Sequence, residues 1–179
     1  MKNTALDDKS GQALVESCVM VILLCLILLG LFQVSQIFMA EEILNYAAAR
    51  GARARAVGFN PFMVYKTSRV GSIAAAGLMT QPGRQSSQWA QLLVEESRIP
   101  LYLGAQQWAQ LPPILDYRDW NTIAYPPTTW EESLSSMVNV RLDQEYPLNI
   151  AFHRAFYGAD EVDLRGDARF DNHYPLYLQ

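Results

Sequence analysis

Hydrophobic residues are concentrated in one run near the N-terminus. No charged residue occurs from Ser17 to Ala40, a stretch of 24 positions. At about 1.5 Å per residue, a helix of this length spans about 36 Å, more than the hydrocarbon core of a bilayer at about 30 Å. A buried helix of a soluble protein is the alternative, but such helices rarely run this long without polar positions. The run therefore predicts a single membrane-spanning helix.

The helical pattern continues beyond this run. Residues 41–57, EEILNYAAARGARARAV, have helix-forming composition, and no small-residue cleavage site of a secretory signal precedes them. Their small residues line faces on which a neighbouring backbone can approach closely: Ala47, Ala48, Gly51, Ala52 and Ala56. We expect one continuous rod from about Gln12 to Val57, ended by Phe59-Asn60-Pro61.

The middle of the chain shows two shorter helical patterns. Residues 62–79 predict a helix with an alanine-rich centre, and residues 80–83 predict a turn. Residues 87–98 predict a second helix, capped by Ser86 or Ser87. Four tryptophans are expected to anchor a core or a subdomain interface, with surface adhesion as the alternative: Trp89, Trp108, Trp120 and Trp130.

The C-terminal third changes to the two-residue period of β-strands. Apolar and polar residues alternate over 138–142 and again over 162–170, and Gly158-Ala159-Asp160 predicts a turn between them. Residues 148–156 predict a further strand or a bulged continuation. So small a sheet cannot stand alone and is expected to pack on the helical stem. The predicted fold class is α+β: a long transmembrane and stem helix packed against a small antiparallel C-terminal sheet, with a helical and loop-rich insertion.

Composition and charge mainly exclude functions. The 179 residues are 50% hydrophobic and carry a formal net charge of −4, which argues against a general nucleic-acid binder. The only cysteines, Cys18 and Cys25, lie seven apart in the apolar run, and the two histidines show no metal-ligand spacing. No nucleophile, phosphate-loop or zinc-protease motif occurs. We therefore expect no enzyme, no metal and no cofactor. Arg165-Gly166-Asp167 falls inside the alternating pattern, so we interpret its two charged residues as part of the wet face of a strand and not as an adhesion motif.

One carboxylate stands at the entrance of the apolar run. Glu16 follows Ala13, Leu14 and Val15. A carboxylate costs about 2.5–3.5 kcal/mol at the centre of a membrane helix and less near an interface. Either Glu16 reaches the headgroups, or a cation compensates its charge.

The residues before Glu16 favour the second possibility. Lys9-Ser10-Gly11 followed by Gln12-Ala13-Leu14-Val15-Glu16 resembles a prepilin processing site of the type IV pilin superfamily. The resemblance implies that a prepilin peptidase cuts after Gly11, so that Gln12 becomes the N-terminus and Glu16 the fifth mature residue. It also implies that Glu16 sets axial register by pairing with the Gln12 amine of a neighbour.

Two further segments indicate a branch of that superfamily. The stem YAAARGARARAV, residues 46–57, is similar to the stem of TadE-like proteins, the minor pilins or pseudopilins of the tight-adherence (Flp-type) pilus machinery. The segment VDLRGDARFDNHYPL, residues 162–176, resembles the closing strand of the same family. Ser17 departs from the aromatic residue usual after the Glu in Flp-type motifs. Lysine and arginine counts do not favour a cytoplasmic N-terminus, so that orientation follows from the resemblance alone.

The resemblance implies a membrane-anchored assembly component of a tight-adherence pilus or a related filament or secretion machine. Residues 1–11 would be a cytoplasmic leader, 12–58 the transmembrane and stem helix, and 59–179 an extracytoplasmic domain, helical and loop-rich over 59–130 and strand-rich over 131–179. Expected partners are the prepilin peptidase, other pilins, an inner-membrane pilus platform and the lipid bilayer, with no nucleic acid. The expected location is the bacterial inner membrane, with passage into a surface filament. The alternatives are a pseudopilin of a type II secretion-like system and an uncleaved, signal-anchored extracytoplasmic binding protein or enzyme.

Overall fold

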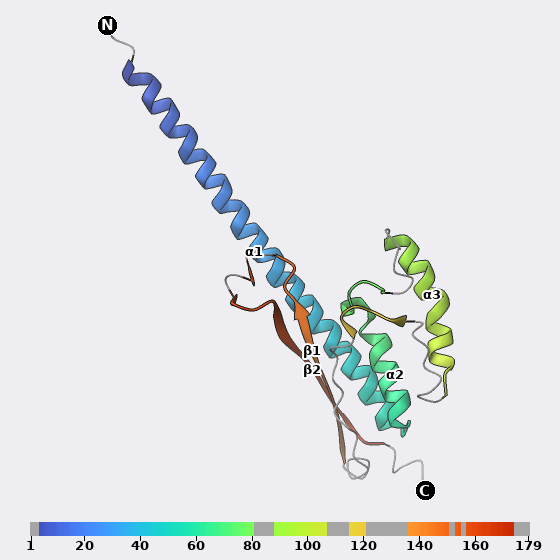
Figure 1. Cartoon of the computed structure of the whole chain (residues 1–179). Helices are drawn as coiled ribbons and strands as arrows, with labels where there is room; N and C mark the ends of the chain where they lie inside the picture. The colour runs from blue at the N-terminus through green and yellow to red at the C-terminus, as the bar shows by residue number, and fades with distance from the viewer. Residues whose placement is uncertain are drawn as a thin grey trace.

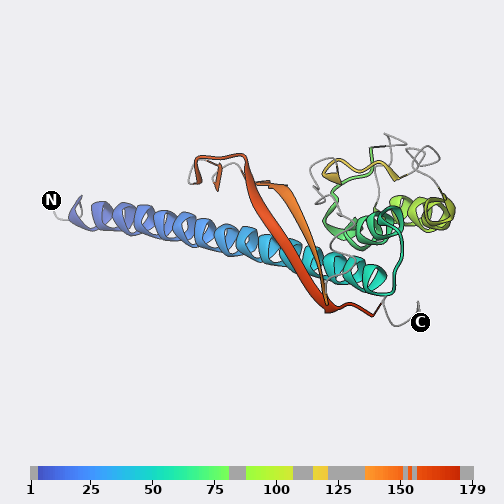
Figure 2. The same cartoon turned by 90° about the horizontal axis from the view of Figure 1, so that it is seen from below.

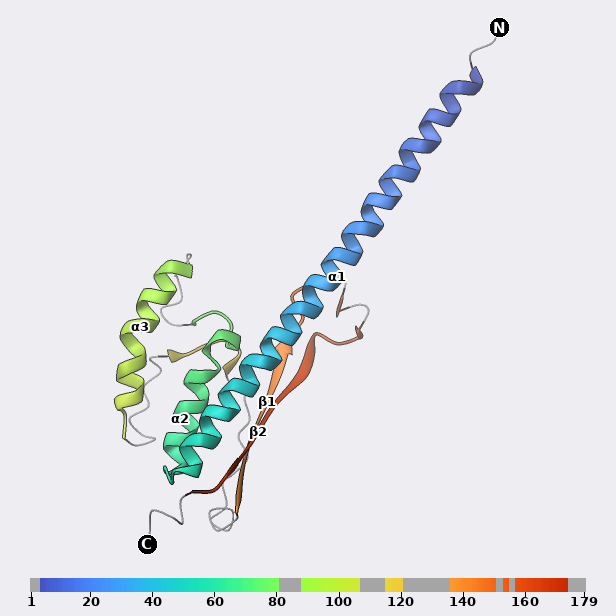
Figure 3. The ribbon, with the colours of Figure 1, turned by 180° about the vertical axis from the view of Figure 1, so that it is seen from behind.

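The molecule is organised around one long helix, α1, which runs from Thr4 to Ala56 (Figure 1). The computed structural model describes residues 4–80, 88–106, 115–120, 136–150, 153–154 and 157–173. The N-terminal half of α1 projects alone, and the other elements gather around its C-terminal half (Figures 1 and 3). The α+β class and one continuous helix through the apolar run and the stem are thus confirmed, and this helix begins at Thr4 instead of the predicted Gln12.

The chain reverses at the predicted break. After Ala56, Gly58 adopts a φ of 97°, and Asn60 caps the helix α2, Pro61–Gly71, by accepting a hydrogen bond of 2.9 Å from the Met63 N–H. Proline suits the first helical position because no N–H is needed there. The cap and the proline together fix where α2 starts, beside α1 (Figure 3).

The helix predicted over residues 62–79 is shorter than expected. α2 ends at Gly71, and the Ser72 N–H donates back to the Ser68 and Arg69 carbonyls. The alanine-rich segment forms a single 3₁₀ turn, η1, over Ile73–Ala75, instead of continuing the helix. Adjacent glycine and serine weaken an α-helix, which explains its end at this point.

Two strands pair along the stem, as the alternating patterns predicted. β1, Met137–Pro147, and β2, Glu161–Asp171, are antiparallel, with Leu142 opposite Gly166. The strands lie alongside the C-terminal half of α1 (Figure 2). Burial alternates along β1, and its buried side chains are Val138, Val140, Leu142 and Gln144. The pair therefore turns its apolar face to the stem, which supplies the cover that so small a sheet needs.

The closest approach of the sheet to the stem is at Gly166. A Cβ on this glycine would lie 2.5 Å from both the carbonyl carbon and the oxygen of Leu44. One residue further along each element, the Asp167 N–H donates to Asn45 Oδ1 at 3.1 Å. Backbone contact of this kind is possible only without a side chain, so Gly166 is a packing residue of β2.

The described part of the connection between the strands contains no strand, and residues 153–154 in it are helical. The prediction of a further strand over residues 148–156 is wrong at its described positions, since Leu148–Ile150 lie outside β1 and 153–154 are helical. The His153 N–H donates to the Ile150 carbonyl and the Gly158 N–H to the Arg154 carbonyl. Gly158, with a φ of 67°, lies in the predicted turn before β2.

The outer face of the sheet is charged, and Arg165 and Asp167 are exposed on it, which confirms that these two charges lie on the wet face of a strand. Gly166 between them is buried against the stem. Asp143 accepts hydrogen bonds from Arg165 at 2.9 Å and Arg141 at 3.2 Å. Partial burial raises the pKa of the Asp143 carboxyl, but the two arginines outweigh this and hold that pKa below its usual range.

This network predicts a small loss of stability in acid. Because the folded pKa of Asp143 lies below its unfolded value, its contribution is complete above the usual range and disappears as the pH falls through the folded pKa. The groups are about half exposed, so we expect a loss of only about 0.5 kcal/mol. Denaturant unfolding of the full chain at pH 2 to 6 should show this loss, and Asp143→Asn should remove it.

The third helix, α3, covers Gln88–Gly104 and is longer than the predicted 87–98, because it continues through Pro100. A lysine of α2 forms hydrogen bonds with the C-terminal end of α3. The Lys66 ammonium is buried and donates to the carbonyls of Leu103, at 2.6 Å, and Ala105. Burial lowers the pKa of Lys66. Lys66 therefore caps the last turn of α3, where backbone carbonyls otherwise lack partners.

We expect Lys66→Met to destabilise the attachment of α3 by about 1.5–3 kcal/mol. Methionine preserves the apolar stem of the side chain but leaves the two carbonyls without their donor. The measurement is the unfolding midpoint of the full chain in detergent micelles, with Arg169→Met on the exposed face of β2 as the surface control. Equal midpoints for the two variants would contradict the capping role.

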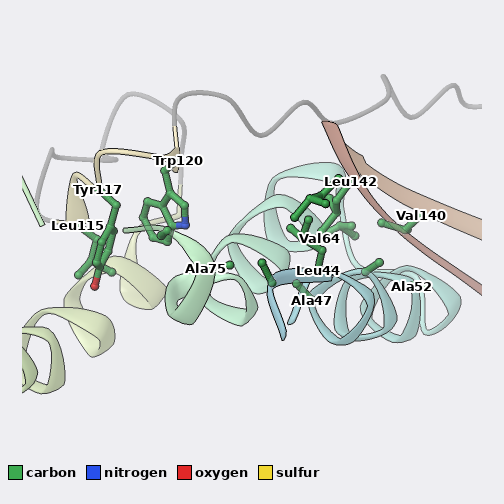
Figure 4. Close-up of a cluster of buried hydrophobic side chains, with 14 of the residues drawn as sticks. Leu44, Ala47, Ala52, Val64, Ala75, Leu115, Tyr117, Trp120, Val140 and Leu142 are labelled. Atoms are coloured by element: carbon green, nitrogen blue, oxygen red, sulfur yellow. The ribbon is translucent and has the colours of Figure 1, made fainter. Parts of the chain in front are cut away.

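The core extends from the stem to the segment 115–120. Figure 4 shows Leu44, Val64 and Leu142 at one end and Tyr117 and Trp120 at the other. The Trp120 Nε1–H donates to Ser72 Oγ at 3.2 Å, and the Tyr117 and Trp120 rings stack edge-on at 4.6 Å. Trp120 is thus the core anchor predicted. The Trp89 side chain, Trp108, Trp130, Ser86, Ser87 and most of the predicted turn at 80–83 lie outside the described residues.

Candidate functional site

Residues 11–29 of α1 form an apolar helix on which no other described part of the chain packs. Every residue from Gly11 to Leu29 is exposed, and large side chains cover all sides of this segment. Leu23, for example, has 52% of its surface exposed and Ile27 has 55%. Each such side chain gains about 1.5–3 kcal/mol on leaving water. The helix is long and apolar enough to cross a membrane, and it anchors the chain there.

The predicted processing site lies at the start of this exposed segment, inside the helix. No atom lies within 4 Å of the position that a Cβ on Gly11 would take. Gln12 and Glu16 are exposed and four residues apart, so they fall on the same face with a rise of about 6 Å between them. No hydrogen bond or ion pair of the Glu16 side chain occurs within the described part of the chain. An N-terminal amine on Gln12 would be the nearest cation on that face.

Three polar or weakly polar side chains follow Glu16 in this exposed segment, and none of them needs a charged partner. The Ser17 hydroxyl donates to the Ala13 carbonyl at 2.9 Å, which satisfies it without an external partner. Cys18 and Cys25 are free thiols exposed on the helix surface. The Glu16 carboxylate, in contrast, has no hydrogen-bond or ion-pair partner within the described part of the helix.

The predicted small-residue positions of the stem lie against elements of the same chain. All are buried: Ala47, Ala48, Gly51, Ala52 and Ala56. A Cβ on Gly71 of α2 would be 2.9 Å from Ala47 Cα, and a Cβ on Gly51 would meet both Ser68 of α2 and Val140 of β1. In this structure the close backbone approach at these positions is thus made by Gly71 of α2, whereas β1 reaches Gly51 through the Val140 side chain.

The comparison with family models bears on this helix. Residues 11–53 match the model of the family described as TadE-like protein. These residues are a TadE-like segment. The match begins at Gly11 and ends at Arg53, so it includes Gly11 to Glu16 of the predicted processing site, the apolar run and most of the small-residue stem. The match confirms the predicted resemblance over this part of the chain. It supports the interpretation of the chain as a component associated with the tight-adherence pilus.

The TadE-like match does not extend to the C-terminal strand that also resembles the family. No curated protein and no solved structure matches the chain.

One feature that the sequence did not predict marks the outer end of the bare helix. Gln33 is fully buried, and a Cβ on Gly30 would lie 3.4 Å from His153 Nε2 of the strand connection. The predicted span, residues 17–38, is therefore covered by the domain on one face of its last turns, while Leu31, Phe32 and Phe38 remain exposed. Gln33 and His153 lie far apart in the sequence and belong to no shared motif, so the sequence does not predict this contact.

Proposed function

We propose that the chain is a minor pilin: a structural, non-enzymatic component that assembles through its N-terminal helix into a tight-adherence pilus or a related filament. The observation that carries this proposal is the helix of residues 11–29, which is bare on every side and lies within the TadE-like segment. A membrane-bound enzyme would need this helix only as an anchor, whereas a pilin also uses it to pack against other subunits. The position of Glu16 within it supports the proposal further.

The assembly step follows from the chemistry of that helix. In the inner membrane, with the N-terminus in the cytoplasm, lipid covers the apolar side chains. A prepilin peptidase removes residues 1–11 and creates an amine at Gln12. In a bundle of like helices, the same side chains pack against each other, and Glu16 pairs with the Gln12 amine of a neighbouring subunit. Such a pair favours one axial register over slipped ones, because only that register compensates the carboxylate.

The proposed partners act at successive stages. The peptidase recognises the processing site, a membrane platform holds the processed chain, and other pilins receive its helix. The domain beyond the stem remains folded throughout, because in the described part of the chain its hydrophobic core starts at Ala40, with the partly buried Ile37 packed against it.

The proposal is tested in a strain of the source bacterium that lacks this chain. We expect surface pili, counted by electron microscopy, to be lost or reduced at least tenfold, and to return when the full chain is supplied. Normal piliation in the deletion strain would overturn the role in this filament. Loss of a secreted protein set with normal pili would indicate the type II secretion-like alternative instead.

A further inference from the structure

The depth of the domain relative to the membrane follows from the exposure of α1. The helix is bare from Gly11 to Leu29, 19 residues that span about 28 Å, close to the thickness of the hydrocarbon core. Coverage by the domain begins at Gly30 and Gln33. The opposite face of α1 stays exposed and apolar through Leu31, Phe32 and Met39, so the outer edge of the hydrocarbon layer lies between Gly30 and Met39. The lipid headgroups then lie at the level of the adjoining turns of α1. This placement depends on α1 crossing the membrane and not on the pilus role.

A groove with a volume of about 420 Å³ opens at that level. Its first wall is α1, which contributes Gln36, Met39, Ala40 and Ile43. The other walls come from η1 and the segment after it, from residues 118–119, and from the end of β1 with its connection. Gln36 lies about 9 Å along the axis from Gly30, so the groove begins close to the bilayer surface.

The groove combines apolar and cationic groups. Met39, Ile43 and Leu78 give it an apolar lining. Arg118 and Arg154 add two guanidinium groups from separate walls, and both residues are exposed. This pairing of a lipophilic surface with cations suits an amphiphile better than a purely polar ion.

The charges in the groove favour an anion. Arg154 Nε donates to the Leu148 carbonyl at 2.7 Å, and its nearest carboxylate, Asp160, is 3.8 Å away and mostly in water. Asp119 is the acidic residue that lines the groove. Burial raises the pKa of its carboxyl, although Arg118 acts in the opposite direction. The lining holds two arginines and one partly buried carboxyl, so it carries one more basic than acidic side chain.

We propose that this groove binds the phosphate-bearing headgroup of an anionic phospholipid in the leaflet beside the domain. Guanidinium groups recognise phosphate oxygens through paired, charge-assisted hydrogen bonds. Arg118 and Arg154 contact the phosphate, and the start of an acyl chain or the glycerol lies on Met39 and Leu78. A bound lipid would hold the domain at a fixed height and orientation above the membrane.

The test measures lipid retention by the full chain in detergent micelles, using native mass spectrometry. Dioleoyl-phosphatidylglycerol and dioleoyl-phosphatidylcholine are added at equal concentration. We expect the anionic lipid to be retained about tenfold more strongly, and Arg118→Gln combined with Arg154→Gln to remove this preference. The control combines Arg165→Gln with Arg169→Gln, which removes the same charge from the outer face of the sheet and should leave retention unchanged.

A second variant keeps the test independent of charge and of the Arg154 contact with the backbone. Ala74 is exposed and lines the groove, so Ala74→Phe fills it without altering a cation. We expect at least a fivefold loss of lipid retention in this variant with unchanged circular dichroism. Displacement of phosphatidylglycerol by millimolar inorganic phosphate would show that a free phosphate is the ligand. Equal retention of both lipids by the unaltered chain, or full retention by Ala74→Phe, would overturn the proposal.

Discussion

Glu16→Ala is expected to abolish assembly, reducing incorporation into filaments at least tenfold while the chain remains in the membrane. In a bundle of apolar helices the local dielectric constant is low, so the attraction between the Glu16 carboxylate and a neighbour's N-terminal amine is large. Without the carboxylate, that amine would be left buried and uncompensated, which is strongly unfavourable. The measurement is the amount of this chain in sheared pilus fractions relative to membranes.

Two comparisons define the result for Glu16. Glu16→Gln retains the size and polarity of the side chain but not its charge, and should fail almost as completely as Glu16→Ala. Ser17→Ala, on the adjacent position, removes only an internal hydrogen bond and should assemble normally. No described residue of the domain contacts Glu16, so thermal unfolding of the domain should be the same in all three variants. Normal filament incorporation of Glu16→Ala would contradict the proposed register mechanism.

Gly166→Ala is expected to produce the largest loss of stability among single methyl additions in the domain, about 1–3 kcal/mol. The added Cβ would lie 2.5 Å from two backbone atoms of Leu44, which cannot rotate away as a side chain would. The strand must therefore move off the stem, and this opens the contact that covers the sheet. Denaturant unfolding of the full chain in micelles, followed by circular dichroism, measures the change.

Gly104→Ala provides the matched control for this packing effect. Gly104 is the last residue of α3, and no atom lies within 4 Å of the position that a Cβ would take. The same methyl group should there change stability by less than about 0.5 kcal/mol, because it meets only open space. Comparable destabilisation at both positions would show that β2 does not depend on close contact with α1.

The parts of the fold that the sequence predicts correctly are those with local and repeated patterns. The apolar run from Ser17 to Ala40 specifies a helix by length alone, and the alternation over 162–170 specifies a strand with one buried face. Gly166 falls on that buried face, where a glycine indicates close backbone approach. A signal for this contact was therefore present in the sequence.

The errors lie where tertiary contacts override local pattern. The alanines after Ser72 favour a helix, yet η1 forms there and places the Ala75 carbonyl within 2.9 Å of the Gln144 amide, which donates to it. Residues 148–156 have apolar and aromatic positions typical of a strand, but the described part of the connection folds into turns against α1. Neither outcome can be inferred without knowing that the sheet lies beside the stem.

The two candidate sites differ in whether the sequence alone could predict them. The predicted processing site, from Gly11 to Glu16, is contiguous and follows from the resemblance of these residues to prepilin processing sites. The groove is assembled from four separated parts of the chain, and Arg118 and Arg154 belong to no motif. Their proximity depends on the packing of η1 and the strand connection around α1, so only the structure shows it.

The central claim is that this chain enters the prepilin pathway through its N-terminal helix. The most direct test is the N-terminal sequence and intact mass of the chain recovered from native membranes. We predict a chain that begins at Gln12 and lacks the mass of residues 1–11. A chain that begins at Met1 would contradict the account and indicate an uncleaved membrane anchor.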